Sequence, residues 1–135
     1  MIEPRESDPV PRTKSYRDLI VWQRSIQLVK RVYELTRAFP ADERFGLVSQ
    51  MRRGAVSISS NIAEGQARRT TGEFIQFISH AEGLTAELDT QFIIACELGF
   101  VPEHSRGEIP GLIDEVSRML NALRRSVSPQ LTTRH

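Results

Sequence analysis

Cysteine is nearly absent from this 135-residue chain, and long apolar runs are missing altogether. The one cysteine, Cys96, cannot form an intrachain disulfide, and its place in the run FIIACEL predicts a buried, unreactive thiol. No stretch of about 18 apolar residues exists to span a bilayer, and the amino-terminal MIEPRESDPVPRTK lacks the apolar segment of a signal peptide. We therefore expect a cytoplasmic protein without a membrane partner.

The motifs of common catalytic and metal sites are missing as well. The sequence contains no G-x-S-x-G, no P-loop and no G-x-G-x-x-G. No glutamate stands three residues before a histidine, as a ferritin-like di-metal site requires. His80 has its nearest upstream arginine at Arg69, too far for an Arg-x4-6-His ribonuclease pair, and is expected at the edge of the core. The sequence thus predicts no enzyme, no cofactor and no metal.

Lysine is scarce, and charge is unevenly distributed. Of 18 basic residues 16 are arginine, which suits bidentate pairing with carboxylates or phosphates, although a general bias toward arginine explains the count equally well. Residues 1–69 contain 13 basic and 8 acidic residues, whereas 70–135 contain 5 and 9. The stretch 70–99 has no lysine or arginine at all. The two halves are therefore electrically complementary.

The only strong period in the sequence is helical, and nothing alternates with period two. With short connections, four helical segments predict an all-α fold, an antiparallel up-down four-helix bundle. The expected helices cover about 16–39, 42–65, 70–98 and 109–127, with a flexible arm at 1–15 and a flexible tail at 128–135.

Several residues mark the expected helix ends. Pro40 ends the first helix and Asp42 is a candidate cap for the second. Thr70-x-x-Glu73 is a capping box that opens the third helix, which Gly99 ends. Because proline is tolerated only in the first turn of a helix, Pro110 does not allow the first residue of the last helix to be fixed from the sequence.

The first helix has two adjacent apolar stripes where a small bundle needs about one. A wide apolar arc of this kind favours contacts between copies of the chain, and we expect the bundle to assemble into a ring. The stripes consist of Leu19, Trp22, Ile26, Val29 and Tyr33, and of Val21, Leu28, Val32, Leu35 and Phe39.

The second helix carries small and polar residues on one face. Gln50, Gly54, Ser57 and Asn61 recur at helical spacing, with Glu64 beside them. Gly, Ser and Asn cost a few tenths to about 1 kcal/mol each relative to Ala, so a packed contact with hydrogen bonds across it is expected to offset that cost. The alternative is that the serines are exposed surface and that Gly65 merely follows the end of the helix.

Four stretches resemble a known family. They are YRDLIVWQRSIQLVKRVYELTRAFP, FGLVSQMRRGAVSISSNIAEG, GEFIQFISHAEGLTAELDTQFIIACELGF and RMLNAL, and they resemble the four-helix-bundle proteins encoded in intervening sequences of bacterial 23S rRNA genes. Ser59 and the connection from Arg106 to Pro110 depart from the family pattern. By matching position, the signature polar residues are Gln50, Asn61, Glu64, Gly65 and Glu87, for which the resemblance implies a structural role.

What the resemblance implies is an assembly, without an established activity. The family is similar to the accessory variability determinant of diversity-generating retroelements, a pentameric barrel that binds a reverse transcriptase and nucleic acid. The resemblance therefore implies a homopentamer, with RNA, DNA or a reverse-transcriptase-like protein as possible partners.

Two functional hypotheses follow from the sequence. The first is a homo-oligomeric assembly module that docks a protein or RNA–protein partner. The second is a nucleic-acid-binding protein that contacts the phosphates of structured RNA or DNA through Arg52, Arg53, Arg68 and Arg69. Because no aromatic residue is interleaved with these arginines, the sequence argues against stacking on single strands.

Overall fold

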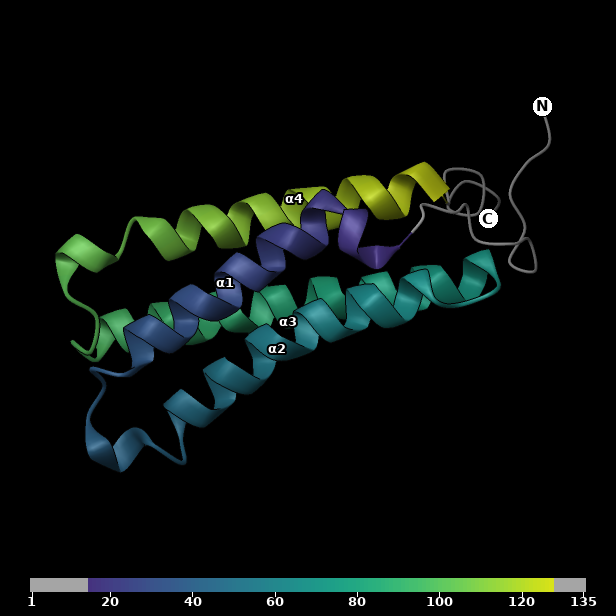
Figure 1. Ribbon diagram of the computed structural model, residues 1–135. Coiled ribbons are helices and arrows are strands. Elements are labelled where there is room, and N and C mark those ends of the chain that lie inside the picture. Colours follow the sequence, from purple (N-terminus) through teal and green to yellow (C-terminus); the bar gives the residue numbers. More distant parts are fainter. Residues whose placement is uncertain (1–14, 128–135) are drawn as a thin grey trace.

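The structure, a computed structural model, describes residues 15–127, and this part of the chain consists of four α-helices without any strand (Figure 1). The predicted all-α fold is therefore confirmed. The predicted arm and tail lie outside the described residues, apart from Ser15. The helices are α1 (Ile20–Thr36), α2 (Leu47–Gln66), α3 (Thr71–Glu97) and α4 (Glu108–Val127), and short 3-10 turns lie at η1 (Tyr16–Asp18), η2 (Ala41–Glu43) and η3 (Glu103–Ser105).

Successive helices run in opposite directions and pack as a bundle (Figure 1). Each helix contacts its two neighbours, α1 with α2 and α4, and α3 with α2 and α4, so that α1 and α3 occupy opposite corners. One apolar core lies between them, and all four helices contribute fully buried side chains to it. These include Leu28, Met51, Ile58, Leu88 and Val116.

Local sequence determines both ends of α3. The backbone N–H of Glu73 donates to Thr70 Oγ1 at 3.2 Å, which confirms Thr70 as the cap of α3. The Glu73 carboxylate reaches back to the Thr70 hydroxyl, which donates to Glu73 Oε1 at 2.9 Å. At the other end Gly99 has φ +79°, the left-handed conformation that glycine adopts without a steric penalty. The N–H of Phe100 then donates to Ala95 O at 2.9 Å and closes the helix.

The first two helices begin later than the sequence predicts. Leu19 has an extended backbone that separates η1 from α1, so the predicted helix over 16–39 is divided. The prediction that Asp42 caps the second helix is wrong, because Asp42 lies within η2 and α2 starts at Leu47. Glu43 takes the capping role instead, since its Oε1 accepts from the N–H of Leu47 at 3.2 Å.

The last helix starts at Glu108 and contains Pro110. In the first turn of a helix the backbone N–H has no intrahelical partner, so a proline there removes nothing. This explains why the chain can continue through Pro110 without a break.

The two apolar stripes of α1 have different surroundings. Val21, Leu28 and Val32 are buried in the core. Trp22 and Val29 of the other stripe are only half-buried and pack against the edge of the core. The surplus apolar arc of the first helix therefore lies at the protein surface.

Candidate functional site

The small, polar face of α2 lies against α3 at Gly65. This glycine is buried within α2, and a Cβ added to it would lie 3.0 Å from the Cβ of Phe77 and 3.6 Å from the Ile78 Cδ1. The alternative that Gly65 merely follows the helix end is therefore wrong. Its missing side chain allows α2 and α3 to approach closely.

The predicted hydrogen bonds across this contact are not made among the described residues. Asn61 Nδ2 donates to the carbonyl of Ser57 on its own helix at 2.8 Å. Glu64 is exposed and lies 3.9 Å from the guanidinium of Arg68, which follows the end of α2. Gln50 and Glu87 are exposed as well. The residues of the expected polar seam thus contact residues four positions away in the sequence, because an amide or carboxylate at i reaches the turn at i±4 more easily than the next helix.

A buried polar residue of α3 that faces α2 is Gln91, which is not among the residues predicted from the sequence. Its side chain is 6% exposed, and its Oε1 lies 3.9 Å from where a Cβ on Gly54 would be. Its Nε2 donates to Glu87 at 3.4 Å, while Oε1 has no hydrogen-bond partner among the described residues. In a helix whose other buried positions are mostly apolar, nothing in the local sequence distinguishes Gln91 from an exposed glutamine.

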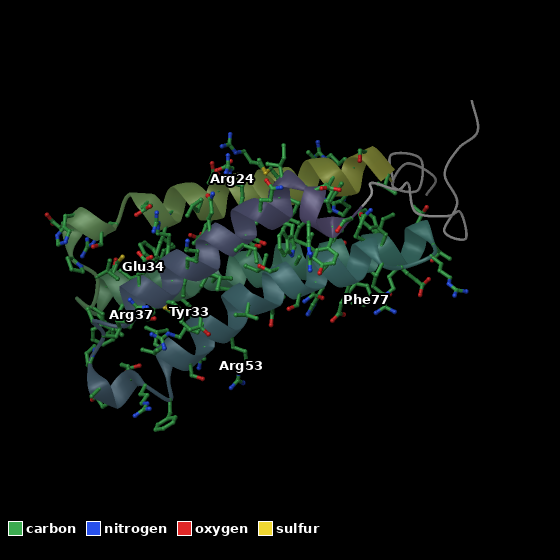
Figure 2. The ribbon with its side chains drawn as sticks, viewed as in Figure 1. Arg24, Tyr33, Glu34, Arg37, Arg53 and Phe77 are labelled. Carbon is green, nitrogen blue, oxygen red and sulfur yellow. The ribbon has the colours of Figure 1, made fainter. Side chains whose placement is uncertain are left out.

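The four arginines predicted to bind phosphates do not form one cluster. Arg68 lies beyond the end of α2 at Gln66, and Gln66 is fourteen residues after Arg52, or about 21 Å along the helix axis. In Figure 2, Arg53 and Phe77 mark these two separate regions of the molecule. The Arg68 guanidinium lies 4.5 Å from the Phe77 ring centroid and Arg69 is exposed nearby.

Arg52 is held against α1. Its Nε donates to Thr36 Oγ1 at 2.9 Å and its Nη2 donates to the Tyr33 carbonyl at 3.3 Å. The guanidinium also lies 4.5 Å from the centroid of the Tyr33 ring, a cation–π contact. These contacts hold the Arg52 side chain in one conformation between α1 and α2. It therefore has less freedom to adjust to a ligand than an exposed arginine has.

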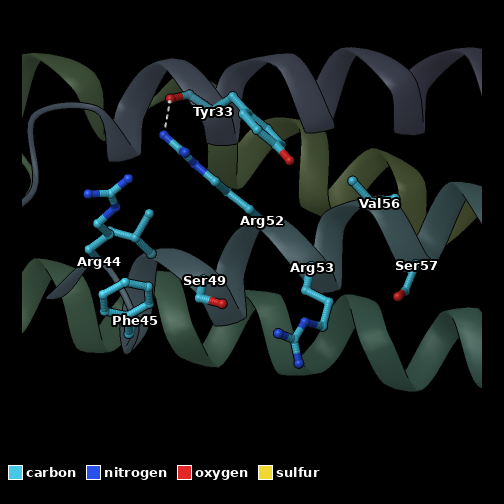
Figure 3. A pocket seen from close by; sticks show the side chains of 9 residues that line it. Tyr33, Arg44, Phe45, Ser49, Arg52, Arg53, Val56 and Ser57 are labelled. Carbon is cyan, nitrogen blue, oxygen red and sulfur yellow. Dashed lines mark hydrogen bonds between the residues drawn. The ribbon is translucent and has the colours of Figure 1, made fainter.

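Arg52 and Tyr33 form one side of an open groove of about 510 Å³ on the outward side of α2, here called the α1/α2 groove (Figure 3). Arg52 reaches toward Tyr33, whereas Arg53, which also lines the groove, extends from α2 in the opposite direction. The lining residues are Tyr33, Arg44, Phe45, Val48, Ser49, Arg52, Arg53, Val56 and Ser57.

Positive charge in the α1/α2 groove is not neutralised. Three arginines and no carboxylate line it, and within residues 15–127 neither Arg44 nor Arg53 makes an ion pair. Arg31 on α1 behaves differently, because its hydrogen bond to Glu108 and the charge of that carboxylate raise its pKa. The groove therefore offers two free guanidinium groups to an anion.

An aromatic ring lies beside these cations. Phe45 is 90% exposed, and the Arg44 guanidinium lies 5.7 Å from its ring centroid. Tyr33, Arg44 and Phe45 were not predicted as site residues, because none of them is interleaved with Arg52, Arg53, Arg68 and Arg69 in the sequence. The adjacent pair Arg44-Phe45 just before α2 was the available signal.

Other candidate groups remain isolated. His80 is exposed on α3, so its predicted place at the core edge is wrong, and Cys96 is half-buried. In the described part of the chain, no three His, Cys, Asp or Glu side chains come together in a group that would hold a metal ion. No helix between residues 15 and 127 has the length and apolar character needed to cross a membrane.

The fold and the groove together define a small all-α protein, an antiparallel four-helix bundle with a basic and aromatic groove beside its second helix. The chain belongs to the 23S rRNA-intervening sequence protein family, whose family model matches residues 17–122. The family predicted from the four sequence stretches is thereby confirmed.

A solved structure is similar in fold. It is a protein of unknown function from the S23 ribosomal protein family of Bacteroides thetaiotaomicron, with a TM-score of 0.72. The match covers 78% of this chain and 96% of that chain at 18% sequence identity, which shows a common fold and nothing more. No curated protein matches this chain.

Proposed function

We propose that the protein is a non-enzymatic assembly module that associates with copies of itself and docks a protein or RNA–protein partner. The observation that supports this proposal is the outward face of the last turns of α3. There Ile93, Ile94 and Leu98 are 52%, 44% and 57% exposed within six residues. Three large aliphatic side chains at one helix end are unusual for a surface that faces only water.

The composition of α3 supports the same conclusion. An amphipathic helix at a bundle corner normally has charged residues of both signs on its outward face. α3 contains no lysine or arginine in its 27 residues. Burying apolar surface contributes about 25 cal/mol per Å², so covering this face with another molecule is favourable.

A second apolar surface lies at the opposite corner of the bundle. The half-buried stripe of α1 includes Trp22, Ile26 and Val29, and Tyr33 at its end is exposed. A contact between two unlike surfaces of the same chain is head-to-tail, and such contacts close into a ring when the rotation fits. The family resemblance leads us to expect five subunits.

Light scattering coupled to size exclusion tests this proposal. Wild type is expected at a mass near five times 15.3 kDa, the mass of one chain. Ile94→Glu places a charge in the proposed contact and should shift the mass toward that of a single chain. Ala122→Glu adds the same charge at an exposed position of α4 and should leave the mass unchanged. A wild-type monomer at micromolar concentration would refute the assembly role.

A further inference from the structure

We infer that the α1/α2 groove is a binding site for single-stranded nucleic acid, in which a base stacks on Phe45 and the neighbouring phosphates bind Arg44 and Arg53. This goes beyond the assembly role and does not depend on it. Three features of the groove lead to this ligand: its charge, its exposed ring and its length.

The charge of the groove requires an anionic ligand. Arg44 and Arg53 have no ion-pair partner within residues 15–127, and no carboxylate lines the groove. Guanidinium groups bind phosphate oxygens in a bidentate manner. The hydroxyls of Ser49 and Ser57 line the same surface and are able to donate to phosphate or sugar oxygens.

The exposed ring of Phe45 selects an unpaired base. A phenyl ring that is 90% exposed offers its surface to another flat ring. In a duplex the base faces are covered by their neighbours, whereas in a single strand they are free to stack on aromatic side chains. Arg44 beside the ring adds a cation next to the stacked base.

The length of the groove favours a nucleic-acid strand over a free phosphate ion as its ligand. Its lining includes Val48 and Val56, eight residues apart on α2, which corresponds to about 12 Å along the helix axis. One phosphate group cannot occupy both this length and the region of Phe45. Arg52, held by Tyr33 and Thr36, gives the groove a fixed side.

Fluorescence anisotropy with the full chain tests the inference. The probes are a labelled twelve-nucleotide single strand, as RNA and as DNA, the corresponding duplexes, and a nucleoside monophosphate as competitor. Wild type is expected to bind the single strands more tightly than the duplexes, with little competition by the mononucleotide. Two neutralised phosphates predict about sevenfold weaker binding when salt rises from about 50 to about 200 mM.

Variants of the two exposed residues separate stacking from charge. Phe45→Leu keeps an apolar side chain without a stacking ring and should weaken single-strand binding about tenfold, whereas Phe45→Tyr should restore it. Arg53→Gln should reduce the salt effect to about threefold, since one phosphate contact remains. Arg125→Gln removes the same charge from an exposed position of α4 and should change neither value.

Three results would overturn the inference. The first is no single-strand binding by wild type at about 50 mM salt. The second is equal affinity for single strand and duplex, unchanged by Phe45→Leu, which would indicate phosphate contacts without stacking. The third is a change of oligomeric mass in Phe45→Leu or Arg53→Gln at unchanged affinity, because the groove would then be covered by another copy of the chain. A monomer that still binds single strands would refute the assembly role alone.

Discussion

Replacing Gly65 by alanine tests how closely α2 and α3 approach each other. In the interior of an ordinary helix this substitution stabilises by about 1 kcal/mol, because glycine has the greater conformational freedom in the unfolded chain. Here the new methyl carbon would lie 3.0 Å from Phe77 Cβ and 3.6 Å from the carbonyl oxygen of Phe74. A Cβ is attached directly to the backbone, so relief requires α3 itself to move.

The expected magnitude follows from these two opposing contributions. Overpacking a tight contact costs about 1 to 3 kcal/mol, and the helix preference of alanine returns about 1. Gly65→Ala should therefore lower the free energy of unfolding by about 1 kcal/mol. Gly83→Ala is the matched control, since a Cβ at Gly83 of α3 meets nothing within 4 Å, and it should raise that free energy by up to about 1 kcal/mol.

Urea denaturation followed by circular dichroism measures the difference. The two variants should differ by about 2 kcal/mol, or about 1 M in the urea midpoint. All samples need the same protomer concentration, because association stabilises by mass action. Gly54→Ala provides a second comparison on α2, where the nearest atom, Gln91 Oε1, is 3.9 Å away. If Gly65→Ala were as stabilising as Gly83→Ala, the close approach of the two helices would not limit the residue at this position.

Two further predictions concern hydrogen bonds. The hydroxyls of Ser25 and Ser59 lie 2.8 Å apart in the interior between α1 and α2, and Ser25→Ala should cost about 1 to 2 kcal/mol because it leaves the Ser59 hydroxyl buried without its partner. A double-mutant cycle with Ser59→Ala should give a coupling of about 0.5 to 1 kcal/mol, and zero coupling would contradict the contact. Thr70→Ala should cost about 1 kcal/mol in thermal or urea unfolding, whereas Thr70→Ser should cost a few tenths. Equal losses in the two Thr70 variants would mean that the hydroxyl does not cap α3.

The sequence alone determined the helices and most of their ends. Helical periodicity depends on residues three and four apart, and the capping box of Thr70 and Glu73 lies within one turn. Gly99 likewise ends α3 through its own backbone conformation. Asp42 shows the limit of this reasoning, because its side chain type suits a cap but the chain forms a 3-10 turn there before α2 begins.

The family was also readable from the sequence, whereas the roles of its signature residues were not. Asn61 and Glu64 stand at the spacing of a packed face, yet their polar partners lie four residues away in the sequence and not on α3. Gly65 stands where a helix end was possible, yet it lies within α2 at a place where a Cβ would be only 3.0 Å from the Phe77 Cβ of α3. Periodicity gives the side of a helix on which a residue lies, but the distance to the next helix depends on the packing of the whole bundle.

The sequence already pointed to Arg52 and Arg53, but the tertiary structure decided which other residues join them in the groove. Tyr33 and Arg52 are far apart in the sequence and meet because α1 and α2 pack side by side. Arg68 was grouped with Arg52 by composition, but Arg52 lies near the start of α2 and Arg68 lies beyond its end at Gln66, several helical turns away. Phe45 lines the groove because the short segment between η2 and α2 lies beside it. Short-range preferences fix each helix in turn, while a groove made by two helices and a connection exists only once their packing brings distant residues together.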